Sequence, residues 1–272
     1  MTGRVCHWLR EGRSVDRPAA VNPYVPLTLI KRILCPRRCG DGKAPISSLK
    51  LIVSITSKVA IFAILLFLPA ATLDWWRAWL FIGVVFAGGV ASLVSLFPGH
   101  KELLGERLKP PIQKGQPLAD KIVLVLYLAT FFGMIAFIPL DVFRYHLMGK
   151  PGTFVSSLGL ALLIAGWWIA YLALRENAFA APVVRHQEER QQTVIDTGFY
   201  SIVRHPLYAG AALLMAGAPP WLESYPAALL ASVPIAAIAL RIIFEERFLR
   251  RELKGYDAYT QRVRYRLIPL LW

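Results

Sequence analysis

Three polar clusters in the C-terminal third of the chain contain the side chains that could carry chemistry. They are D-T-G-F-Y-S-I-V-R-H-P-L-Y at 196–208, R-I-I-F-E-E at 241–246, and Y-D-A-Y-T-Q-R-V-R-Y-R-L-I-P at 256–269. They offer arginines that can hold an anion, carboxylates that accept hydrogen bonds, and tyrosines with flat aromatic faces. We predict that the three clusters converge at one depth and line a pocket that faces the cytosol.

The spacing within the clusters supports this prediction. Arg241 and Glu245 are four residues apart, so they share one helix face, and Arg241 lies inside an apolar run, where an arginine indicates a functional site. Pro206 suits the first turn of a helix, because its missing N–H has no partner to lose there. His205 is therefore predicted to cap a helix and to face the pocket. Arg204 could instead be a lipid-facing charge that fixes topology.

The elements that position these clusters are predicted to be membrane spans. The chain has 272 residues, of which 56% are hydrophobic, and the runs 78–97, 122–140 and 154–174 contain no charge. Each run is long enough to cross a hydrocarbon core of roughly 30 Å. A further span is predicted from about Leu51 to Ala71. Small residues in the fourth span could allow another helix to approach closely, namely Gly159 and Gly166.

Two shorter apolar runs follow, Leu207–Leu222 and Pro226–Leu240, separated by the turn signal P-P-W-L-E-S-Y-P. Sixteen helical residues reach only about 24 Å, which predicts a tight hairpin that dips into the bilayer or barely spans it. The sequence E-E-R-F-L-R-R-E-L then predicts an amphipathic interfacial helix. The predicted fold class is all-α, a polytopic integral membrane protein with four full spans, a C-terminal helical hairpin and a cytosolic amphipathic tail.

The predicted domains are a flexible basic cytosolic extension at 1–48, a four-span transmembrane region at 49–175, and a hairpin with its tail at 176–272. The net charge is +14, and basic residues crowd alternate loops, which places both termini and the pocket on the cytosolic side. This basic excess favours anionic lipid as a partner and argues against nucleic acid. The cysteines, all in the extension, are predicted to be free thiols open to lipidation: Cys6, Cys35 and Cys39.

The order of motifs also resembles a known family. The segments G-F-Y-S-I-V-R-H-P-L-Y-A-G, R-x-x-x-E-E-x-F-L and Y-x-x-Y-x-x-R-V-x-Y-R-L-I-P-x-x-W resemble the isoprenylcysteine carboxyl methyltransferase family. Its wider superfamily includes the membrane phospholipid N-methyltransferases. The resemblance covers about 182–272 and implies methyl transfer from S-adenosyl-L-methionine to a lipidic or small hydrophobic acceptor, with isoprenylcysteine carboxylate-type O-methylation favoured. The sequence contains no G-x-G-x-x-G motif of the kind that would indicate a soluble dinucleotide-type domain.

The resemblance also implies roles for residues at matching positions. It implies Arg241 and Glu245 as catalytic residues, Arg241 as the substrate-binding residue, and no metal. Glu246 joins the cofactor contacts on chemical grounds, because either adjacent carboxylate could accept from an amine or a ribose hydroxyl. The predicted cofactor contacts are Arg185, Gln192, Thr193, Val194, Ile195, Tyr200, His205, Pro206, Leu207, Tyr208, Glu245 and Glu246. Arg185 stands where the family commonly has an amide side chain, and Gln192 where the prenylcysteine enzymes have histidine.

Three alternatives stay open. A phospholipid N-methyltransferase would need to deprotonate an amine, and no dedicated base is apparent, whereas a carboxylate acceptor is already ionised at pH 7. The ending V-R-Y-R-L-I-P also resembles NADPH-dependent sterol-type membrane reductases, although those enzymes need a larger cavity and more spans. A transporter or sensor would place polar residues near the middle of the first four spans, where few occur. The sequence leaves the acceptor and the oligomeric state open.

Overall fold

The computed structural model describes residues 48–96, 105, 110, 112–113, 116–177, 179 and 192–272. Ile46–Trp272 form one compact unit. The described residues are helices, turns and loops, with one isolated β-bridge between Val203 and Tyr265. Residues 1–47 of the predicted extension, with its cysteines, and Arg185 lie outside the described residues. The predicted domain boundary at 175/176 stays a prediction.

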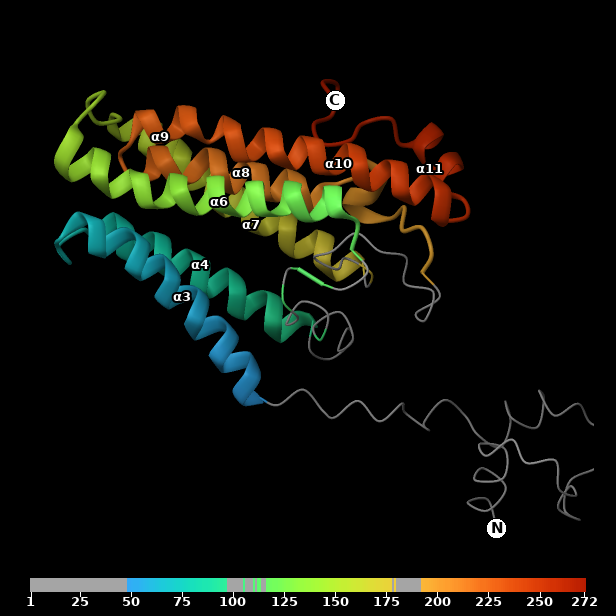
Figure 1. Cartoon of the computed structure of the whole chain (residues 1–272), viewed down its shortest axis with the longest axis horizontal. Coiled ribbons are helices and arrows are strands. Elements are labelled where there is room, and N and C mark those ends of the chain that lie inside the picture. The colour runs from blue at the N-terminus through green and yellow to red at the C-terminus, as the bar shows by residue number, and fades with distance from the viewer. Residues whose placement is uncertain are drawn as a thin grey trace, which may run out of the picture. The chain divides into compact units, whose positions relative to one another are not determined.

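The predicted all-helical, multi-span fold class is confirmed. The first four long helices correspond to the four predicted spans: α3 (Ser48–Ala70), α4 (Trp76–Leu96), α6 (Leu118–Leu140) and α7 (Thr153–Glu176). Four helical stretches of the described chain are long and apolar enough to cross a membrane: Ile52–Ala70, Leu118–Tyr145, Thr153–Glu176 and Tyr225–Glu252. In Figure 1, α6, α8 and α10 lie side by side, and α3 and α4 pair with one another.

The C-terminal hairpin differs from the prediction in its second leg. Its first leg, α8 (Pro206–Trp221), matches the predicted short helix. The second leg comprises α9 (Tyr225–Leu230) and α10 (Ser232–Glu252), so E-E-R-F-L-R-R-E-L continues α10, and the prediction of a separate interfacial helix is wrong. The physical reason is that this stretch contains no Gly or Pro and consists largely of good helix formers. The second leg is therefore long enough to cross a membrane.

Two glycine pairs bring α7 and α8 into close contact, as predicted for α7. A Cβ added at Gly166 would lie 2.7 Å from the carbonyl oxygen of Gly210, and one at Gly159 would lie 2.8 Å from that of Gly217. The two glycines of each helix are seven residues apart, so both fall on one face. In lipid, such close backbone packing is a main source of helix association. This contact fixes α8, whose first residues belong to the predicted site.

The turns far from the site are held by a buried carboxylate. Helix α6 runs into a short π-helix, η1 (Asp141–Tyr145). Asp141 accepts hydrogen bonds from the Ser224 hydroxyl at 2.7 Å and from the backbone N–H of Leu147 at 3.0 Å. The Ser224 hydroxyl in turn accepts from the N–H of Ala227 and caps α9. Both turns of the bundle are thereby joined at this end.

We expect Gly166→Ala to lower the melting temperature of the detergent-solubilised protein. The added methyl would meet the backbone of α8, which cannot yield as a side chain can, and overpacking of this kind typically costs about 1–3 kcal/mol. Gly133→Ala in α6 is the matched control, because a Cβ there meets nothing within 4 Å. Equal melting temperatures for the two variants would contradict the proposed role of the α7–α8 contact.

Candidate active site

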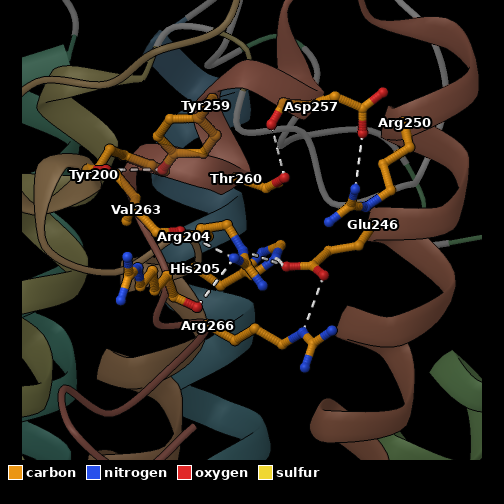
Figure 2. Close-up of polar contacts among 11 residues, drawn as sticks. Tyr200, Arg204, His205, Glu246, Arg250, Asp257, Tyr259, Thr260, Val263 and Arg266 are labelled. Carbon is orange, nitrogen blue, oxygen red and sulfur yellow. Dashed lines mark hydrogen bonds and ion pairs between the residues drawn. The ribbon is translucent and has the colours of Figure 1, made fainter.

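The carboxylate of Glu246 is the centre of a buried polar network at the C-terminal end of α10. Figure 2 shows Arg204, His205 and Arg266 directed at this carboxylate. Arg204 Nε donates to Oε1 at 2.6 Å, Arg266 Nε donates to Oε2 at 2.9 Å, and His205 Nε2 lies 3.2 Å from Oε1. Glu246 is only 3% exposed. Both carboxylate oxygens are thus engaged by protein groups, which offsets the cost of burying the charge.

The chain after α10 is held against the start of α8 by hydrogen bonds. Residue Gly255 has φ of 85°, a left-handed conformation that glycine adopts readily, and the short helix α11 (Tyr256–Arg262) begins immediately after it. The backbone N–H groups of Arg204 and His205 donate to the carbonyls of Tyr265 and Arg266, both at 2.9 Å. The guanidinium of Arg204 also donates to the carbonyls of Val263 and Arg264. The tail therefore forms one wall of the site.

Two tyrosines of α11, in this C-terminal tail, are buried. Tyr259 donates from its hydroxyl to the carbonyl of Tyr200 at 2.7 Å, in the 3₁₀ turn η3 (Gly198–Ser201). Burial raises the pKa of the Tyr259 phenol, and burial together with the Glu246 and Glu245 carboxylates raises the pKa of the Tyr256 phenol. Both groups therefore stay protonated at neutral pH and can act as hydrogen-bond donors. Tyr256 and Tyr259 pack with Val194 of the predicted cofactor segment.

Glu245 faces a different neighbour from Glu246. Consecutive residues of a helix point about 100° apart, so the two carboxylates of α10 cannot share one environment. The Tyr208 hydroxyl of α8 donates to Glu245 at 2.7 Å, and the guanidinium of Arg241 lies 5.9 Å from the centre of the Tyr208 ring. Glu245 is half-buried. Among the described residues, this tyrosine is its hydrogen-bond donor, so the carboxylate keeps acceptor capacity for a ligand.

Arg241 has an acidic partner that the sequence analysis missed. Its Nε donates to Oδ1 of Asp120 at 3.0 Å, and the exposed fractions of the two residues are 6% and 3%. Asp120 lies in the first turn of α6, where a helix stabilises a negative charge. The signal was available: a buried arginine needs a counter-ion, and Asp120 is the acid that directly precedes the uncharged run of the third span.

The structure brings together much of the predicted set. His205, Tyr208, Arg241, Glu245 and Glu246 lie at one end of the bundle, where α6 and α8 begin and α10 ends. His205 occupies the N-cap position of α8 with Pro206 in its first turn, as predicted, but its ring contacts Glu246 and does not cap the helix. Arg204 is buried and paired, so the lipid-facing alternative is wrong for it. Neither Arg204 nor Arg266 was among the predicted site residues.

The remaining predicted cofactor contacts lie on the segment that leads into η3 and on the first turn of α8. Gln192–Ile195 have no regular secondary structure and none of them is fully buried, whereas Tyr200 is buried. These residues and Glu245 provide an aromatic face, backbone groups and a carboxylate with spare acceptor capacity. This donor set fits S-adenosyl-L-methionine, which presents an adenine, ribose hydroxyls, an amine and a sulfonium.

Comparisons with known proteins point in the same direction. Residues 154–254, which include α8, α10 and the site residues on them, match the phospholipid methyltransferase family. Two rice proteins, from Oryza sativa subsp. indica and subsp. japonica, are each named a probable protein-S-isoprenylcysteine O-methyltransferase. Each is 29% identical to this chain over 203 residues, which cover 69% of this chain and 93% of the relative. The chain is a membrane methyltransferase that is similar to the phospholipid methyltransferases and to proteins named as isoprenylcysteine O-methyltransferases.

Proposed function

We propose that this membrane methyltransferase transfers the methyl group of S-adenosyl-L-methionine to the carboxylate of a lipidic, isoprenylcysteine-type acceptor. The observation that carries the proposal is the placement of Glu245 one turn after Arg241, with Tyr208 donating to Glu245 and the Arg241 guanidinium lying over the Tyr208 ring. One carboxylate is open to a cationic or hydroxyl-bearing ligand, and one guanidinium lies beside it. The names of the two rice relatives support the same acceptor class.

Each side chain then has a defined task. S-adenosyl-L-methionine would supply an activated methyl group. Glu245 would accept hydrogen bonds from its amine or ribose hydroxyls, while Tyr208 orients that carboxylate. Arg241 would hold the acceptor carboxylate, with most of the rate arising from positioning and exclusion of water. A carboxylate acceptor is ionised at pH 7, so no residue has to remove a proton.

Phospholipid N-methylation is the second candidate. The match of residues 154–254 to the phospholipid methyltransferase family favours it. An ammonium group would have to lose its proton before it could attack, whereas Asp120 is paired with Arg241 and the proposal assigns Glu245 to the cofactor. We therefore favour the carboxylate. The positions of basic residues in the sequence support a cytosolic pocket and cytosolic termini.

Calorimetric titration of the purified protein with S-adenosylhomocysteine, beside NADPH, tests the cofactor. We expect saturable binding of S-adenosylhomocysteine and no binding of NADPH, because the site offers a carboxylate acceptor beside an aromatic ring. Binding of NADPH alone would replace the proposal with the reductase alternative. Radiolabelled methyl transfer to N-acetyl-S-farnesyl-L-cysteine, compared with transfer to phosphatidylethanolamine in bilayers, then distinguishes the two acceptors.

The adjacent glutamates provide a matched pair of variants. We expect Glu245→Gln to fold but to bind S-adenosylhomocysteine about 10- to 100-fold more weakly, since a hydrogen bond to a charged group contributes about 1.5–3 kcal/mol. Glu246→Gln should instead lower the melting temperature strongly, because it leaves Arg204 buried without its carboxylate, a loss of about 3–5 kcal/mol. Normal affinity in a folded Glu245→Gln protein would remove Glu245 from the cofactor site.

A further inference from the structure

Asp120 has no part in the proposed mechanism, yet it is the buried counter-ion of the arginine that would hold the acceptor. Its two oxygens have separate partners: Oδ1 accepts from Arg241 Nε, and Oδ2 accepts from the side-chain amide of Gln116. Gln116 is itself buried, at 6% exposure. This arrangement holds the Asp120 carboxylate in one orientation through protein contacts alone. The inference below rests on the proposed function.

The guanidinium of Arg241 is fixed between two helices. Asp120 of α6 engages it through Nε, and the ring of Tyr208 of α8 lies 5.9 Å from its central carbon. A guanidinium carries five N–H donors in one plane, so the Nε contact occupies one part of that fork and determines where the rest of it points. An acceptor carboxylate that binds Arg241 must therefore share the guanidinium with Asp120.

We infer that Asp120 is a positioning residue that shares Arg241 with the acceptor carboxylate and balances its charge. In the transfer step, an acceptor oxygen forms the new O–CH₃ bond while the donor's S–CH₃ bond breaks and its electron pair remains on sulfur. No proton is released, and a negative and a positive charge are both consumed. An isolated arginine would stabilise the charged acceptor more than the transition state, in which that charge is already fading. Such ground-state stabilisation slows the chemical step.

Asp120 offsets this effect because its negative charge cancels part of the attraction between Arg241 and the acceptor. The geometry allows the acceptor to be oriented by hydrogen bonds without being held too strongly by charge. A purely structural role makes a different prediction, since loss of a structural contact would weaken acceptor binding and cofactor binding together. The direction of the change in acceptor affinity therefore separates the two roles.

We expect Asp120→Asn to bind the acceptor acid more tightly and to turn it over more slowly. Asparagine keeps an oxygen that can accept from Arg241 Nε but removes the negative charge. The ratio of the affinities for N-acetyl-S-farnesyl-L-cysteine and its uncharged primary amide, measured by titration of protein saturated with S-adenosylhomocysteine, should rise about tenfold over wild type, equivalent to about 1.4 kcal/mol. The KM for the acid and kcat should both fall, with affinity for S-adenosylhomocysteine unchanged.

Asp141→Asn is the matched control. Asp141 follows the opposite end of α6, is equally buried at 3% exposure, and also accepts two hydrogen bonds, but it lies at the turns and not beside Arg241. We expect this variant to lose stability without any change in the ratio of acid to amide affinity. Asp120→Glu, which restores the charge, should return that ratio toward the wild-type value.

The outcomes separate this inference from the proposed function. If S-adenosylhomocysteine does not bind wild type, the proposed function fails. If it binds but the acid does not, the proposed acceptor fails together with the role of Asp120, and only the cofactor assignment stands. If both bind and the ratio in Asp120→Asn is unchanged or lower, the role of Asp120 alone is overturned. If Asp120→Asn cannot be recovered folded, the affinities of the wild-type protein for the acid and for the amide test the inference. A preference for the acid below about tenfold supports charge balancing, and a larger preference overturns it.

Discussion

The shared carboxylate of Glu246 is the interaction on which the rest of the site depends. It joins the start of α8 through Arg204 and His205 to the C-terminal tail through Arg266, and it does so from the last third of α10. Arg204 and Arg266 lie 42 and 20 residues from Glu246 in the sequence. A buried charge is tolerated only when its partners are held in good geometry, so each segment is held in place by the other two. The walls of the site are consequently fixed before any ligand arrives.

This end of the bundle also depends on how closely α7 and α8 approach. The glycine pairs place the two backbones in contact along most of α8, and the orientation of His205 and Tyr208 at its start follows from that contact. At the opposite end, Asp141 joins the turns before α7 and after α8. The hairpin is thus held at both ends and along its length. Polar groups at a membrane depth are tolerated here because protein, and not lipid, surrounds them.

Much of the fold could be predicted from hydropathy, because the length of an uncharged run reports directly on its environment. The spans, the first hairpin leg, the proline in the first turn of α8 and the glycines of α7 are all local signals. The continuation of α10 to Glu252 was missed for a physical reason. Charged residues lower the hydropathy of a segment, but Arg241 and Glu246 have buried partners that no local pattern reveals. The sequence signals that a buried arginine needs an acidic partner and offers Asp120 beside the third span, but it does not show that these two residues, more than a hundred positions apart, meet in the fold.

The residues around Arg241 and those around Glu246 form two polar networks with different consequences for chemistry. Glu246 has both oxygens engaged by protein donors, so binding a ligand through it would require breaking contacts that hold the tail. Glu245 is half-buried and accepts from one neutral hydroxyl, so its carboxylate keeps capacity to accept further hydrogen bonds. Arg241 is intermediate between the two glutamates in its availability to a ligand. Asp120 neutralises its charge, but a planar guanidinium has enough N–H donors to bind a second carboxylate. The helical offset between adjacent residues therefore separates the group that maintains the site from the group available to a ligand.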